Sequence, residues 1–213
     1  MNSTARCNVE QLLAEARRGE ATCLGKLLQY YGNYLKLLVT THLDAKLRAR
    51  CSPSDIVQES YFEAHRDFEN FEGRTAAEFL AWLRKILVNN MAREVEKHIL
   101  SAKRDVRREV RLDGMQAAIE QSAARLESVL FAQGPSPSSR LDHQEHAVAL
   151  ANHMAELPTD YREVLVLRHC EGLSFKDIAR QMGRSAGAVR MLWLRAIGQI
   201  REQMNEQGAT SGE

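Results

Sequence analysis

The chain has 213 residues, which allows one large domain or two small ones, each able to bury its own core. Its charged fraction of 27% and hydrophobic fraction of 44% are typical of a soluble globular protein. The formal net charge of +1 argues against a protein that coats nucleic acid through an overall positive field, so any DNA contact has to come from local patches.

Composition and motifs also indicate the cellular compartment and exclude several kinds of functional site. The four cysteines form no CxxC pair, so neither a zinc knuckle nor a disulfide framework is indicated. The N-terminus has no apolar signal core and no run reaches membrane-spanning length, so we expect a cytoplasmic protein. No Gly-rich phosphate loop, nucleophile elbow or catalytic triad pattern occurs. We therefore expect neither an enzyme nor a site for a metal or another cofactor.

Before residue 51 the apolar spacing predicts three short helices. The first spans residues 9–18 and ends at Gly19, the second ends near Gly32, and the third spans residues 34–50.

A further helix is predicted from Ser52, which is a suitable cap, with Pro53 at the first helical position. Carboxylates recur every four residues along one face of this helix, at Asp55, Glu59, Glu63 and Asp67. The stripe is consistent with a solvated acidic face or with a surface for a basic protein partner. A carboxylate-bridged metal site is a third interpretation, but the chain lacks the Glu-x-x-His pattern that such helix-bundle sites use.

The next predicted helix, residues 77–98, combines an apolar face with a strongly basic continuation. Residues 84–111 contain nine Lys or Arg against four acids, a net charge of +5. Asn89 and Asn90 interrupt the apolar pattern midway, which indicates either a helix break or amides that read bases. The segment from residue 112 to about residue 140 differs in composition from the helices before it and ends in GPSPSSR. It is predicted to be a linker, because its prolines break any helix.

Residues 157–201 are typical of a helix-turn-helix, because glycines and capping residues divide them into three helices. Gly172 and Gly183 suit left-handed helix ends, and Ser174 and Ser185 suit the caps of the helices that follow.

The last of these helices has two distinct faces. From residue 178 to residue 201 there is no carboxylate but there are five arginines, which suits a helix laid among phosphates in a major groove. The alternative is an ordinary three-helix bundle with a solvated arginine face. The spacing predicts an inner face of Val189, Trp193, Ala196 and Ile200, and a face toward a partner formed by Arg190, Met191, Leu194 and Arg195.

The order of these parts resembles a sigma-70 family RNA polymerase sigma factor of the extracytoplasmic-function (ECF) type. SPSDIVQESYFEAHRDF looks like region 2.2, FLAWLRKILVNNMAREV like regions 2.3 and 2.4, and LPTDYREVLVLRHCEGLSFKDIARQMGRSAGAVR like region 4. The long linker and the AHRDFENFEG segment are most similar to a subgroup common in planctomycete bacteria. The resemblance implies an all-α protein of two small helical domains joined by a flexible linker. Its expected parts are domain 2 (residues 8–112), a linker (113–140), the helix-turn-helix domain 4 (141–205) and a tail (206–213).

The resemblance also implies a function: binding core RNA polymerase, directing it to promoters by reading their minus-10 and minus-35 elements, and aiding strand opening. The implied partners are promoter DNA and the β′ clamp helices and β flap of the polymerase, and the family also allows for an anti-sigma factor. The residues that match the clamp-binding motif are Asp55, Gln58 and Glu59.

The implied DNA contacts fall on two groups of residues. The expected minus-10 contacts are Arg84, Lys85, Asn89, Asn90, Arg93 and Lys97, with Asn89 matching an asparagine of the family's region 2.3 to 2.4 loop, which captures a flipped base. The expected minus-35 contacts are Arg184, Ser185, Arg190, Met191, Leu194 and Arg195. The sequence departs from the common pattern at Leu192 and Trp193, where many members carry arginine and leucine.

A free-standing transcription regulator with a helix-turn-helix is the alternative interpretation, and an enzyme is a distant third. A regulator of this kind binds duplex DNA alone, as a two-fold dimer at paired half-sites. A sigma factor binds core polymerase one to one and reads promoter strands only in that complex.

Overall fold

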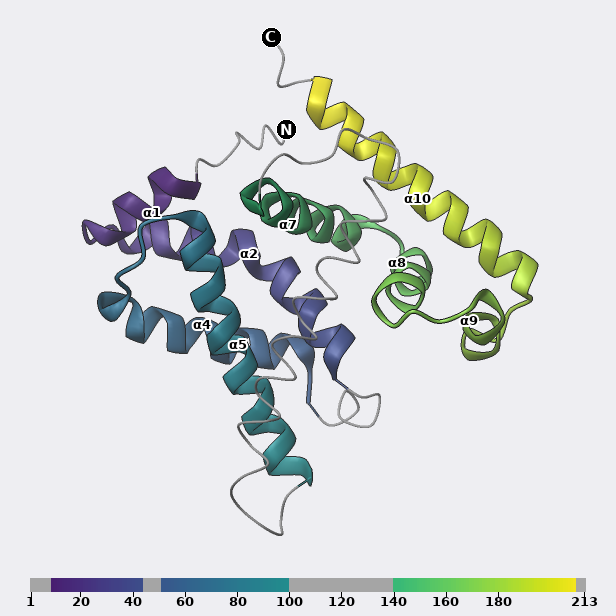
Figure 1. Ribbon diagram of the computed structural model, residues 1–213, viewed down its shortest axis with the longest axis horizontal. Coiled ribbons are helices and arrows are strands. Elements are labelled where there is room, and N and C mark those ends of the chain that lie inside the picture. Colours follow the sequence, from purple (N-terminus) through teal and green to yellow (C-terminus); the bar gives the residue numbers. More distant parts are fainter. Residues whose placement is uncertain (1–8, 44–50, 100–139, 210–213) are drawn as a thin grey trace. The chain divides into compact units, whose positions relative to one another are not determined.

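The computed structural model describes residues 9–43, 51–99 and 140–209. The chain divides into two compact units, Met1–Ile119 and Glu120–Glu213 (Figure 1). All the regular secondary structure in the described residues is helical, which confirms the expected all-α class. The predicted linker lies almost entirely outside the described residues.

The described residues of the first unit form four α-helices and one short 3₁₀ turn. These are α1 (Val9–Arg17), α2 (Ala21–His42), α4 (Pro53–Asp67), the turn η1 (Phe68–Asn70) and α5 (Ala76–Ile99). Helices α2, α4 and α5 pack on one another, and α1 packs on α2 and α5. The predicted core face of α5 is confirmed, because all of its members are buried: Phe79, Leu80, Leu83, Ile86, Leu87 and Met91.

Helices α4 and α5 both begin at capped ends. The Ser52 hydroxyl accepts a hydrogen bond from the backbone N–H of Ser54 at 3.2 Å, and Pro53 is the first residue of α4, as predicted. Helix α5 begins with a capping box that we did not predict. There the Glu78 carboxylate accepts from the backbone N–H of Thr75 at 3.0 Å, and the Thr75 hydroxyl accepts from the N–H of Glu78 at 3.2 Å. Hydrogen bonds from backbone N–H groups lower the pKa of Glu78.

The prediction that a helix ends near Gly32 is wrong, because α2 runs unbroken from Ala21 to His42. Gly32 instead provides room for a neighbouring helix: a Cβ atom at this position would overlap the hydroxyl of Tyr61 on α4. The glycine therefore serves close helix packing. Residues 44–50, the end of the predicted third helix, lie outside the described residues.

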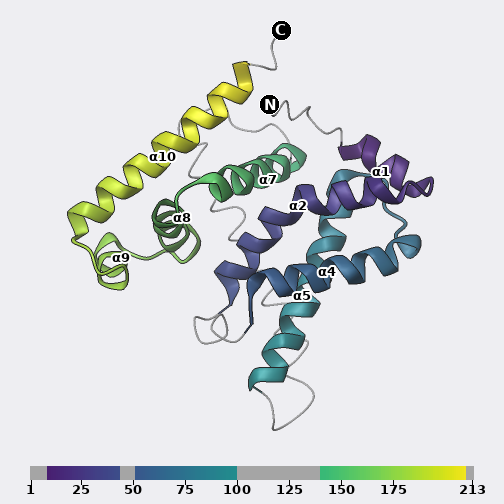
Figure 2. The same cartoon turned by 180° about the vertical axis from the view of Figure 1, so that it is seen from behind.

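The described residues of the second unit form α7 (Arg140–Glu156), α8 (Thr159–Leu165), the π turn η2 (Val166–Cys170), α9 (Phe175–Gln181) and α10 (Ala186–Ala209). Helix α10 packs along α7, α8 and α9 (Figure 2).

The predicted helix ends and helix caps of the helix-turn-helix are confirmed. Gly172 and Gly183 have φ of +70° and +63°, in the left-handed region that glycine adopts readily. The Ser174 hydroxyl accepts from the backbone N–H of Asp177 at 3.2 Å, and the Ser185 hydroxyl accepts from that of Ala188, also at 3.2 Å.

One arginine that the prediction did not single out closes the end of α7. Arg162 of α8 donates hydrogen bonds to the carbonyls of Met154, Ala155 and Leu157 at 2.8 to 3.1 Å. The last turn of a helix leaves such carbonyls without intrahelical partners, so this contact satisfies them and joins α7 to α8.

Among the described ranges, no helix combines the length and the apolar character needed to span a membrane. Within the same ranges, no group of three or more His, Cys, Asp and Glu side chains is arranged to hold a metal ion.

Candidate functional site

The exposed face of α4 carries the three residues expected to bind core polymerase. Asp55, Gln58 and Glu59 are all exposed. Phe62 joins them, because positions 55, 58, 59 and 62 follow the i, i+3, i+4, i+7 spacing of one helical face. Phe62 is 73% exposed, although it is a large apolar side chain. We call these four residues the α4 face.

Phe62 was not among the predicted site residues, although its position in the sequence carries a signal. The buried residues of α4 include Ile56, Val57 and Ala64, and Phe62 is out of phase with them. An aromatic side chain out of phase with a core stripe indicates an exposed apolar residue.

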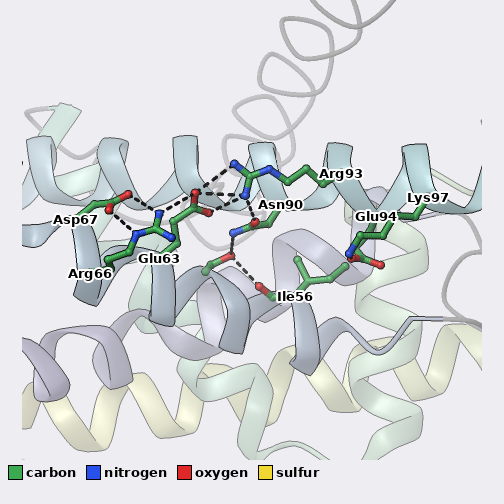
Figure 3. A network of polar contacts seen from close by, with 9 residues as sticks. Ile56, Glu63, Arg66, Asp67, Asn90, Arg93, Glu94 and Lys97 are labelled. Atoms are coloured by element: carbon green, nitrogen blue, oxygen red, sulfur yellow. Dashed lines mark hydrogen bonds and ion pairs between the residues drawn. The ribbon is translucent and has the colours of Figure 1, made fainter. Parts of the chain in front are cut away.

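The second half of the acidic stripe is neutralised within the unit. The Glu63 carboxylate accepts hydrogen bonds from both terminal nitrogens of Arg93 on α5 at 3.2 Å (Figure 3). Asp67 forms a bidentate pair with Arg66 at 2.7 and 2.9 Å, and this hydrogen bonding lowers the pKa of Asp67. The available negative charge of α4 is therefore concentrated toward its N-terminal end, at Asp55 and Glu59.

Asn90, predicted to contact the minus-10 element, is buried in the interface of α4 with α5, with 4% of its surface exposed. Its amide nitrogen donates to the Ser60 hydroxyl at 3.2 Å, and its amide oxygen accepts from Arg93 at 3.0 Å (Figure 3). The Ser60 hydroxyl in turn donates to the Ile56 carbonyl at 2.7 Å. Both ends of its amide are used in this way, so Asn90 joins α4 to α5, and its contact to the minus-10 element stays a prediction.

Neither the helix break nor the region 2.3 to 2.4 loop expected near Asn89 is present, because α5 is continuous from Ala76 to Ile99. Asn89 is half-buried, one helical position away from Asn90. Each residue turns the helix by about 100°, so the two neighbouring amides face different surroundings.

Asn89 belongs to a basic row on α5. Positions 85, 89, 93 and 97 are spaced by four and so lie along one side of the helix. Lys85, Arg93 and Lys97 are exposed, although Arg93 is paired with Glu63 and Lys97 with Glu94. We call this set the α5 row: Lys85, Asn89, Arg93 and Lys97.

Arg84, also expected at the minus-10 element, is half-buried beside the core. Its guanidinium carbon lies 5.5 Å from the centroid of the Tyr34 ring, within the range of a cation–π contact. Its Nε atom is buried, with no hydrogen-bond partner among the described residues. Arg84 is therefore tied to the core of its own unit, unlike the exposed members of the α5 row.

In the second unit, the two predicted faces of α10 are largely as expected. Val189, Ala196 and Ile200 are buried and Trp193 is half-buried, while the core also takes in Leu192 and Ile197. On the opposite side, Met191 is 50% exposed and Leu194 is 49% exposed. With Arg190 and Arg195, which are exposed as well, they form the α10 face.

The turn before α10 is held by polar contacts within the unit. Arg184, expected to contact DNA, forms an ion pair with Asp160 at the start of α8. Ser185 caps α10 through its hydroxyl oxygen. These contacts fix where α10 begins.

An aromatic cluster fixes the position of α10 and holds Arg190 at its side. The Trp193 indole N–H donates to Nε2 of His169 at 2.8 Å, and the Trp193 ring meets Phe175 edge to face at 5.7 Å. The guanidinium of Arg190 lies over the Phe175 ring at 5.5 Å. Burial, assisted by Arg168, lowers the pKa of His169 to about 4, so the ring is neutral at pH 7 and accepts the indole hydrogen bond. Neither Phe175 nor His169 was among the predicted site residues.

The chain is similar in sequence to several known proteins. The family model described as "Sigma-70, region 4" matches residues 147–200, which include the helix-turn-helix. The RNA polymerase sigma-H factor of Pseudomonas aeruginosa is 29% identical over 195 residues, covering 88% of this chain and 89% of that protein. The ECF RNA polymerase sigma-E factor of Salmonella typhimurium is 30% identical over 159 residues, covering 73% of this chain and 77% of that protein.

A solved structure of the RsbN-BldN complex is 21% identical in sequence, covering 90% of this chain and 98% of that one, with a TM-score of 0.32. The sequence relationship to the sigma-E factor extends over most of both proteins. The chain therefore belongs to the extracytoplasmic-function sigma factors of the sigma-70 family.

Proposed function

We propose that this transcription initiation factor binds core RNA polymerase through the α4 face, contacts the minus-10 element through the α5 row and reads the minus-35 element through the α10 face. The observation that carries the proposal is the presence, in one chain, of an exposed acidic surface that includes an exposed phenylalanine and of an exposed arginine-rich surface without carboxylates. Their expected partners are the β′ clamp helices for the α4 face and promoter DNA for the other two. Residues 8–112 and 141–205 are the proposed domains 2 and 4, and the β flap is the proposed partner of domain 4.

The α4 face has the composition of a binding surface for a basic protein. Asp55 and Glu59 lie one turn apart, and Arg66, one turn beyond Phe62 on the same side of α4, is paired with Asp67. Ion pairs between exposed side chains add only about 0.2 to 1 kcal/mol each, so charge alone supplies little affinity. Burying an exposed phenylalanine contributes about 1.5 to 3 kcal/mol, so Phe62 is the proposed anchor and the carboxylates set the orientation.

The α5 row combines an amide with cations, as strand opening requires. Extruding a base from a duplex costs a few kcal/mol, which contacts to the base and the backbone have to offset. Asn89 is the proposed contact to an extruded base of the minus-10 element. The cations of the row are the proposed phosphate contacts, and Asn90 and Glu63 hold Arg93 in its place within it.

The α10 face fits the major groove, which is wide enough to admit a helix. Arg190 lies near the N-terminal end of α10, the end from which recognition helices reach base edges. Arg201 lies three turns further along the helix, where backbone phosphate is the expected contact.

A competition assay for core RNA polymerase tests the α4 face. We expect the variants Glu59→Lys and Phe62→Ala of the full chain to fold normally and to compete less well for core polymerase, since both residues are exposed. Glu10→Lys is the matched control, because Glu10 is an exposed carboxylate on α1, outside the α4 face. If Glu59→Lys and Phe62→Ala both compete like the wild type, the α4 face is not the polymerase-binding surface.

The same preparation separates a sigma factor from a free-standing regulator. A sigma factor forms a one-to-one complex with core polymerase and selects promoter DNA in that complex. A two-fold dimer that binds paired half-sites without polymerase would contradict the proposal.

A further inference from the structure

The α10 face contains an apolar pair that a general phosphate-binding surface does not need. Met191 and Leu194 are 50% and 49% exposed and lie at i, i+3 spacing, so they are neighbours on the helix surface. Arg190 lies one turn from Leu194, and Arg195 lies one turn from Met191. The result is a small apolar patch bordered by two cations.

The surroundings of this patch are suited to a negatively charged partner. No carboxylate occurs between residues 178 and 201. The first three residues of α10 are small and exposed, namely Ala186, Gly187 and Ala188. No bulky side chain therefore keeps the start of the helix away from a partner surface.

DNA offers one chemical group that matches an apolar patch in a cationic setting. Among the base edges that face the major groove, the 5-methyl group of thymine is the apolar one, and the others are hydrogen-bond donors and acceptors. Methionine and leucine side chains have no hydrogen-bonding group that could read those donors and acceptors strongly, but they can cover a methyl group.

We propose that Met191 and Leu194 recognise thymine methyl groups, and so give this sigma factor a preference for T·A pairs at the positions they cover in the upstream promoter element. The proposal rests on the proposed function, in which the α10 face lies in the major groove. It adds to that function the kind of base that the two apolar residues select. Covering one methyl group should favour thymine over uracil by about fourfold.

Replacing thymine by uracil removes only this methyl group, so it provides the test. The full chain, assembled with core RNA polymerase, is used to select duplexes from two libraries randomised in the upstream region. One library contains thymidine, and the other contains deoxyuridine in its place. Selections are repeated with the double variant Met191→Ala, Leu194→Ala, and with Met204→Ala as a control on the same helix far from the patch.

We expect wild type and Met204→Ala to enrich T·A pairs at particular upstream positions in the thymidine library, with this preference reduced about fourfold per methyl in the deoxyuridine library. We expect the double variant to show the reduced preference with both libraries. Equal enrichment from both libraries by the wild type would overturn the thymine assignment while leaving DNA reading by α10 intact. A double variant that keeps the wild-type preference would also overturn it. If neither library yields any preferred upstream sequence, the proposed function of α10 fails, and the inference fails with it.

Discussion

Asn89 and Asn90 are adjacent and chemically identical, yet we expect their substitution by alanine to affect different properties of the protein. Asn90 is buried and joins α4 to α5 through Ser60 and Arg93. Asn89 is half-buried and belongs to the α5 row. Asn90→Ala should therefore destabilise the first unit, whereas Asn89→Ala should impair promoter opening in a protein of normal stability.

The expected cost of Asn90→Ala follows from the bonds it removes. The variant loses two hydrogen bonds, each with a net contribution of about 1 kcal/mol. Ser60 still donates to the Ile56 carbonyl and Arg93 still pairs with Glu63, so no further donor is left buried without a partner. The free energy of unfolding should fall by about 2 kcal/mol, which lowers the melting temperature of a unit of this size by about 10 °C.

For Asn89→Ala the free energy of unfolding should change by less than about 0.5 kcal/mol. Alanine has the higher helix propensity, which offsets small losses at a half-buried position. Open-complex formation with core polymerase should be slower on a duplex promoter, and a pre-melted template should restore much of the rate, because the cost of unstacking has then already been met.

Two measurements on the same variants test this pair. Unfolding is followed by the fluorescence of Trp82 in a Trp193→Phe background, since the chain has two tryptophans and Trp82 lies in the first unit. Open-complex formation is followed on duplex and pre-melted versions of a promoter recovered by selection. The reasoning is refuted if Asn90→Ala melts like the wild type, or if Asn89→Ala slows both templates equally.

Further predictions concern packing, pH and salt. Gly32→Ala should destabilise the first unit by about 1 to 3 kcal/mol through overlap with the Tyr61 hydroxyl, and adding Tyr61→Phe should restore stability; a double variant no more stable than Gly32→Ala would contradict this packing. The pKa of His169 lies near 4 in the folded protein, below its ordinary value of 6.5, so protonation favours the unfolded chain. The stability that depends on neutral His169 is present above pH 6.5 and is lost as the pH falls toward 4, and His169→Gln should flatten this part of the melting-temperature profile measured by circular dichroism. Arg190→Ala should relax base preference at the upstream element. Arg201→Ala should weaken binding to all sequences alike and reduce the slope of log affinity against log salt concentration by roughly 0.9. Binding measured across single-base variants and several salt concentrations tests both roles, and a reversal of the two effects would contradict them.

Much of the fold could be predicted from sequence where the signal is local. Ser52 and Pro53 mark the start of α4, and Gly172 and Gly183 mark helix ends, because caps and left-handed turns depend on a few neighbouring residues. The outward face of α10 could be predicted for a similar reason, since helical periodicity separates Arg190 and its neighbours from the buried stripe.

Tertiary packing decided the features on which local signals were ambiguous. A glycine can end a helix or admit a neighbouring side chain. Gly32 lies inside the continuous helix α2 and admits the hydroxyl of Tyr61. Two adjacent asparagines carry the same local signal, but the turn of about 100° between them placed only Asn90 against Ser60. The acidic stripe of α4 read as continuous in the sequence, and Arg93, thirty residues along the chain from Glu63, neutralised part of it. Contacts between residues distant in sequence leave no periodic pattern, so only the folded chain shows which charges remain available to a partner.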